Sequence, residues 1–257
     1  MASNTTTDMI NSYTFRQHLD AAIAHGKPGI RIFDGVDRAL AKQLSTIVSG
    51  TAAGYEGRFI NFSYDASMQT VIIAMPSLAH ECIAEFTRSC WRAWEPKLPP
   101  DHEDNLAAMT RPLYEINVSD DIMCVLEPEY SICYEKKKLP NLVIEAGPAE
   151  AYPQLIRNKD LWIYGTKCAV EVVLILKVST LRDGTITAFL EIWRAEPETQ
   201  RYIVLPKQEN EEQPFLYLRD IYGRKHVPLV FDPNQKLPLS LDWLRKAIYK
   251  CARKKYQ

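Results

Sequence analysis

The sequence lacks an apolar run long enough to cross a bilayer. The longest such run, residues 170–178, is short and carries Glu171 and Lys177. The first residues, MASNTTTDMINSYTF, have neither the basic start nor the apolar core of a signal peptide. We therefore expect a protein that does not insert into a membrane and is not secreted by way of a signal peptide.

Paired cysteines are absent as well. The six cysteines lie far apart, with no CxxC pair and no zinc-ligand spacing. A chain of 257 residues can bury a sufficient core without disulfides. These features predict reduced thiols and a cytoplasmic or nuclear protein.

Motifs of several common enzyme classes are also missing. The sequence contains no GxSxG, P-loop or GxGxxG motif, so acyl transfer and nucleotide hydrolysis have no support. The net charge of −1 excludes a globally basic nucleic-acid-binding protein. Basic runs at residues 136–138 and 245–255 are either solvated surface or phosphate contacts.

No linker or internal repeat divides the chain, so we expect a single domain over residues 13–257. Residues 1–12 are polar and are expected to be flexible. Helices are expected at residues 38–49 (capped by Asp37), 77–94, 150–164 and 241–254. Strands are expected at residues 30–33, 58–64, 70–74, 113–118, 123–126, 130–134, 142–146, 170–178, 187–194, 202–205 and 215–218. The strand, helix and strand of residues 142–178 predict a crossover between parallel strands, and hence an α/β fold. The last three strands are expected as antiparallel additions.

An acidic residue ends an otherwise apolar strand, LVIEAG. Burial of the Glu145 carboxylate without a partner is costly, so a cation, a metal ion or hydrogen-bond donors should lie beside it. Because side chains alternate along a strand, Glu145 shares a face with Val143 and Asn141.

A lysine lies in the middle of the apolar stripe of the next helix. On a helical wheel the other members of the stripe are Ala151, Tyr152, Leu155 and Trp162. Lys159 can turn outward to solvent. We predict instead that its ammonium approaches the Glu145 carboxylate, because this helix directly follows the strand that carries Glu145.

A further carboxylate precedes the strand YSICY. In the segment EPE (residues 127–129), Glu129 can begin a strand beside the one that carries Glu145. Two carboxylates can hold Mg²⁺ or Mn²⁺, which activates a water, and a lysine can orient that water and offset charge. Two such acids repel when no metal is bound, so one of them should have a raised pKa.

These residues resemble the PD-(D/E)XK, or restriction-endonuclease-like, superfamily. The segments EPE and LPNLVIE (residues 139–145), followed by the helix with Gln154, Leu155 and Trp162, are similar to nuclease-like proteins of fungi and to the bacterial Uma family. In the order of elements the likeness spans about residues 70–195, including MPS (residues 75–77) and His80-Glu81, and it is detailed over 127–177.

The resemblance implies a restriction-endonuclease-like core, with a central mixed β-sheet flanked by helices, to which this chain adds C-terminal strands and a terminal helix. It implies that Glu129 and Glu145 bind Mg²⁺ or Mn²⁺. Lys159 would take the place of the family lysine, which in bacterial relatives has moved onto this helix, and would complete the catalytic set. Nucleic acid would be the substrate, and a homodimer is compatible with the family because many nucleases pair to cut both strands.

Three positions depart from the family pattern. Glu129 is one methylene longer than the usual aspartate, Asn141 replaces an acid, and Gly147 stands where the lysine normally does. Two functions therefore stay open: metal-dependent hydrolysis of phosphodiester bonds, or an inactive nuclease fold that binds protein or nucleic acid as a scaffold. Glu81 falls opposite the apolar face of its helix, and Gln154, Asn158 and Lys177 are interpreted as surface residues near the site.

Overall fold

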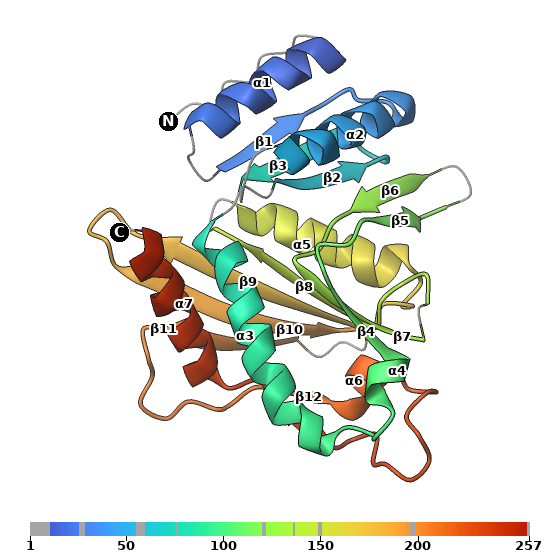
Figure 1. Cartoon of the computed structure of the whole chain (residues 1–257), viewed down its shortest axis with the longest axis vertical. Coiled ribbons are helices and arrows are strands. Elements are labelled where there is room, and N and C mark those ends of the chain that lie inside the picture. The colour runs from blue at the N-terminus through green and yellow to red at the C-terminus, as the bar shows by residue number, and fades with distance from the viewer. Residues whose placement is uncertain are drawn as a thin grey trace.

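Strand β8 (Leu142–Gly147), which carries Glu145, lies inside a mixed six-stranded sheet with the order β11-β10-β9-β8-β7-β4. It pairs antiparallel with β7 (Tyr130–Tyr134) and parallel with β9 (Val172–Thr180). The predicted neighbours of this strand are therefore confirmed. This computed structural model describes residues 11–25, 29–54, 60–75, 77–119, 122–135, 137–148, 151–195 and 199–255 (Figure 1).

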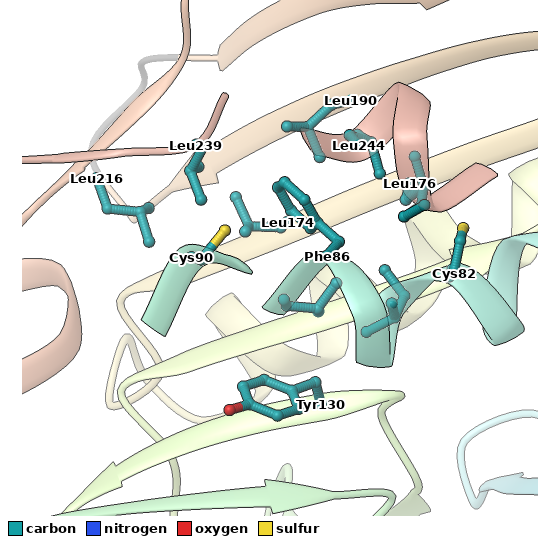
Figure 2. Close-up of a cluster of buried hydrophobic side chains, with 14 of the residues drawn as sticks. Cys82, Phe86, Cys90, Tyr130, Leu174, Leu176, Leu190, Leu216, Leu239 and Leu244 are labelled. Atoms are coloured by element: carbon teal, nitrogen blue, oxygen red, sulfur yellow. The ribbon is translucent and has the colours of Figure 1, made fainter. Parts of the chain in front are cut away.

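Helices flank this sheet as the sequence predicts. Helix α5 (Tyr152–Asp160), extended by a π-helical turn η3 (Leu161–Gly165), connects the parallel strands β8 and β9. Helices α3 (Leu78–Trp94) and α7 (Leu241–Lys255) pack together on the other face. Figure 2 shows part of this core, where Phe86 of α3 lies among leucines that include Leu174 of β9 and Leu244 of α7. The run of apolar residues in β8 thus serves packing on both faces of the sheet.

The edges of the sheet are antiparallel. Strands β10 (Ile186–Arg194) and β11 (Thr199–Leu205) extend it on one side, as predicted. On the other side β4 (Leu106–Thr110), which the sequence analysis missed, pairs with β7. The third predicted strand forms, but it does not extend this sheet. Strand β12 (Phe215–Tyr217) pairs instead with β13 (Lys236–Pro238) in a separate small sheet, beside helix α6 (Leu218–Tyr222).

A second, antiparallel sheet was not predicted. It contains five strands in the order β1-β3-β2-β6-β5. Their bounds are β1 (Gly29–Phe33), β2 (Asn61–Asp65), β3 (Thr70–Met75), β5 (Tyr114–Asn117) and β6 (Met123–Leu126). All five strands were predicted, but only the tertiary structure pairs β2 with β6, across a sequence gap that contains α3 and β4.

Two helices complete the N-terminal part of the chain. Helix α1 (Ser12–His25) was not predicted, whereas α2 (Arg38–Gly54) was, and the Asp37 carboxylate accepts a hydrogen bond of 2.7 Å from the Leu40 amide as its cap. Together with the second sheet they form a hydrophobic core of their own. The prediction of one domain over residues 13–257 stays a prediction.

Two short elements follow α3, namely η1 (Glu95–Lys97) and α4 (His102–Asn105). Some predicted features lie outside the described residues: nearly all of the flexible segment 1–12, the starts of the strand at 58 and the helix at 150, Pro76 and Lys136. Within the described ranges, no helix combines the length and the apolar character that a bilayer span requires.

Helix α5 and the turn η3 lie between the two sheets (Figure 1). Trp162 of η3 packs edge-on against Tyr114 of β5, with ring centroids 5.4 Å apart, and the same apolar cluster includes Val143 of β8. The two sheets therefore meet around the helix that follows Glu145, and this meeting place forms the candidate site.

Candidate functional site

The Glu145 carboxylate is buried at the C-terminal end of β8. The indole Nε1 of Trp162 donates a hydrogen bond of 2.6 Å to it, and Asn158 forms another. These bonds lower the pKa of Glu145, but burial raises it more, to about 8, and the nearby Glu129 adds to the increase. The predicted raised pKa is confirmed, although burial contributes more to it than repulsion. At neutral pH most Glu145 side chains carry a proton.

Glu129 lies beside this strand and is also buried. Its backbone N–H donates to the Ile144 carbonyl at 3.0 Å, which aligns the start of β7 with β8. The side-chain amide of Asn61, on β2 of the second sheet, donates to Glu129 Oε1 at 3.0 Å. The sequence analysis missed Asn61, because no local pattern shows that β2 reaches this carboxylate.

His80, in the first turn of α3, completes the surroundings of Glu129. The Ser77 backbone N–H donates to His80 Nδ1 at 2.9 Å, so Nδ1 is an acceptor and the neutral ring carries its proton on Nε2. Burial lowers the pKa of His80, which favours this neutral form. Nε2 lies 3.6 Å from Glu129 Oε1. Glu81 is exposed, as the helical wheel predicts.

Glu127 is held by other partners. Arg111 approaches its Oε1 to 3.1 Å, and the Phe62 backbone N–H donates to Oε2 at 3.0 Å. Burial raises the pKa of Glu127, and the charge of Arg111 opposes that increase. Glu127 thus links β2 to the segment before β7.

A pocket lies between α5, the end of β8 and the second sheet. Its lining includes Glu145, Gly147, Asn61, His80, Gln154 and Asn158. The cavity volume is about 30 Å³, which is enough for a water or an ion and too small for a nucleotide. Asn158 is buried and accepts a hydrogen bond of 2.8 Å from the amide of Gln154, which is half-buried, so the surface interpretation of Asn158 is wrong.

Lys159 is buried, but it does not approach Glu145. Its ammonium pairs with the Asp160 carboxylate and lies 4.3 Å from the centroid of the Trp193 ring. Within the part of the chain that the structure describes, no ion pair joins Lys159 to Glu145. The predicted direct contact does not form, because the neighbouring Asp160 carboxylate and the Trp193 ring satisfy the cation.

Two of the three departures from the pattern, at Asn141 and Gly147, have structural reasons. Asn141 is buried, and its side-chain oxygen accepts the Tyr134 amide at 3.1 Å, so it shapes the turn between β7 and β8. At Gly147 a Cβ atom would lie 3.1 Å from the Ala151 Cβ. A lysine at position 147 would therefore need α5 to move away from β8.

Carboxylate oxygens, the ligands that a hard divalent cation prefers, lie in and beside the pocket: Glu145 lines it, and Glu129 lies outside its lining. Glu129 and Glu145 offer carboxylate oxygens, and neither forms an ion pair with a lysine or arginine in the described ranges. No group of three His, Cys, Asp or Glu side chains in those ranges is arranged to hold a metal. Mg²⁺ is commonly bound by one or two carboxylates, with water and substrate phosphates completing its shell. Two carboxylates are therefore a sufficient protein contribution for this ion.

Comparison with known proteins leaves this geometry as the main guide to function. No protein-family model matches the chain, and no curated protein is significantly similar to it.

Proposed function

We propose that the chain has a restriction-endonuclease-like core and acts as a metal-dependent phosphodiesterase on nucleic acid. One observation carries the proposal: two buried carboxylates, Glu129 and Glu145, lie together without a lysine or arginine partner in the described residues. Such burial destabilises the fold unless the acids bind a proton or a cation. The mixed sheet flanked by α3 and α5 is compatible with the core that the resemblance implies.

Glu129 and Glu145 would hold the ion. When bound, a divalent ion lowers the pKa of its water and stabilises charge on the phosphate. The protein's own contribution is to orient these acids: Trp162 and Asn158 fix Glu145, while Asn61 fixes Glu129. His80 presents its Nε2 proton toward Glu129 Oε1 and restrains that carboxylate further. Lys159 has no assigned step, because its ammonium is bound to Asp160.

The metal site is tested by thermal unfolding with Mg²⁺ or Mn²⁺. An ion at 100 times its Kd should stabilise wild type by about 2.7 kcal/mol, since it binds the folded state preferentially. Glu145→Gln should abolish the increase in Tm. Glu81→Gln, an exposed change one residue from His80, is the matched control and should keep the increase. A wild-type Tm that millimolar Mg²⁺ and Mn²⁺ leave unchanged would contradict a metal site.

Activity is tested with single- and double-stranded DNA and RNA in the presence of the same ions. Cleavage by wild type should fall by at least about a hundredfold in Glu145→Gln, because a ligand to the activating ion is lost. Glu81→Gln should cleave like wild type.

An inactive scaffold is the second candidate. The small cavity and the commitment of Lys159 to Asp160 favour it, because neither suits a water that must be activated next to a bound phosphate. A protein that binds nucleic acid or a protein partner but cleaves none of the four substrates would support this alternative. A homodimer would be compatible with either function, and its test is the mass of the protein in solution.

A further inference from the structure

A row of paired residues crosses the sheet away from the pocket. In register, Gly147 of β8 pairs with Lys177 of β9, Lys177 with Phe189 of β10, and Phe189 with Ile203 of β11. Paired residues share one face of a sheet, and Tyr152 of α5 contacts Phe189 on this face. Toward β11 the face becomes open, since Ile203 is 41% exposed.

The buried carboxylate of Glu191 holds several side chains of this face in place. Glu191 is 1% exposed and accepts hydrogen bonds from the Tyr152 hydroxyl at 2.9 Å, the Trp193 indole at 3.0 Å and Arg201 Nε at 2.7 Å. These bonds fix the phenol of Tyr152 and the guanidinium of Arg201. The half-exposed side chain of Arg201 is thereby held in one orientation at the surface.

Two cations lie over the Phe189 ring. The Arg201 guanidinium carbon lies 4.5 Å from the ring centroid and Lys177 Nζ lies 5.0 Å from it. The two cations are therefore within about 10 Å of each other, close enough to contact neighbouring phosphates of one strand. Lys177 forms no ion pair with any carboxylate of the described residues, so its charge is not neutralised.

The row is continuous with the pocket. Gly147, which pairs with Lys177, lines the pocket, and so does Ala151, next to Tyr152. Because the pocket has no room for a nucleotide, a polymeric substrate must lie on a surface beside it. Glu191, the acid that Tyr152 and Arg201 contact, is buried beneath its hydrogen-bond donors, so the accessible side of these residues carries cations and aromatic rings.

We propose that Tyr152, Lys177, Phe189 and Arg201 form a binding surface for single-stranded nucleic acid, which continues into the carboxylate pocket. This inference rests on the proposed function and adds the substrate class. Phosphates match the two cations, and the aromatic rings of Tyr152 and Phe189 beside them suit an unpaired base, which exposes its face. Bases of a duplex are stacked on each other and cannot reach the ring.

The test measures binding of labelled oligonucleotides of about 12 nucleotides, single-stranded and duplex, by fluorescence anisotropy in EDTA. Lys177→Gln should weaken single-strand binding about fivefold and reduce the slope of log affinity against log salt by about 0.7, the value for one lost phosphate contact. Phe189→Leu should weaken it about tenfold with an unchanged slope, because a stacked base is lost rather than a charge.

The chain offers a matched control. Lys236 of β13 lies 4.0 Å from the Phe215 ring centroid in the separate small sheet, so Lys236→Gln removes the same kind of cation elsewhere and should bind like wild type. Lys177→Arg should restore the salt slope. This variant also separates loss of charge from loss of folding.

Unchanged affinity in both row variants, or equal weakening by Lys236→Gln, would overturn the proposal. Tighter binding of duplex than of single strands would overturn it too, as would binding of anionic phospholipid vesicles without binding of oligonucleotides. Because EDTA removes the metal, failure of the catalytic proposal leaves these results unaffected. If the protein binds single strands through Lys177 and Phe189 but never cleaves them, only the proposed phosphodiesterase activity is contradicted. If it cleaves nucleic acid while the Lys177 and Phe189 variants bind like wild type, only the proposed binding surface is contradicted.

Discussion

The hydrogen bonds that Glu145 receives from Trp162 and Asn158 favour its ionised form, yet the loss of solvent around the carboxylate outweighs them. The result is a pKa of about 8, against an ordinary value of 4.5. The folded protein therefore binds this proton more tightly than the unfolded chain does. As pH rises from about 4.5 to about 8, the unfolded chain releases this proton while the folded protein still holds it. The free energy of unfolding therefore decreases over this range of pH.

This sign leads to a prediction for the metal-free protein. Glu145→Gln has no proton to lose, so its gain in Tm over wild type should be small near pH 5 and reach several degrees near pH 9. The measurement is Tm against pH in EDTA. Glu115→Gln, at an exposed position of β5, is the control and should follow wild type. A gain in Tm that is largest at low pH would contradict a raised pKa of Glu145 in the folded protein.

At the scale of elements, the close approach of α5 to β8 decides which residues can stand at the end of the strand. Gly147 permits it, since its absent Cβ would lie 3.1 Å from the Ala151 Cβ and 3.3 Å from Leu155 Cδ1. The same approach brings Asn158 to the Glu145 carboxylate. Packing and site geometry thus depend on one helix position.

Gly147→Ala should therefore destabilise the protein by about 1–3 kcal/mol through overpacking. Urea unfolding gives the free energy of unfolding. The double variant Gly147→Ala/Ala151→Gly removes the opposing methyl group and should recover part of the loss, beyond the sum of the two single effects. Strict additivity of the two changes would argue that this contact does not limit the approach of the helix.

At the scale of the whole molecule, the second sheet is what closes the site. The Asn61 amide of β2 donates both to the Glu127 carbonyl, at 2.7 Å, and to Glu129 Oε1, at 3.0 Å. It therefore connects the second sheet to the segment that begins β7.

Asn61→Ala leaves a partly buried carbonyl and a buried carboxylate without this donor. It should lower the free energy of unfolding by about 1–3 kcal/mol. Asn105→Ala, which removes a bond to Asp101 in an exposed turn, should cost less than about 0.5 kcal/mol. Urea unfolding measures both. An equal loss in the two variants would mean that Asn61 matters only as an ordinary surface amide.

The sequence by itself determined most of the local elements and the two acids. The alternation and burial of LVIEAG, the helical stripe after it and the apolar run of β9 predict parallel strands with Glu145 at the end of one, because periodicity reports which face each element buries. EPE at the start of β7 likewise placed Glu129 next to it.

Only the tertiary structure decided what surrounds these acids. The position of Asn61 depends on pairing β2 with β6, and that of His80 on how α3 crosses the sheet, and neither long-range contact has a local signature. Lys159 lies in the apolar stripe as predicted, but a stripe defines a face and not the direction of a long flexible side chain. Its ammonium contacts Asp160 and Trp193 and so does not neutralise Glu145, whose surroundings are set by contacts between distant parts of the chain.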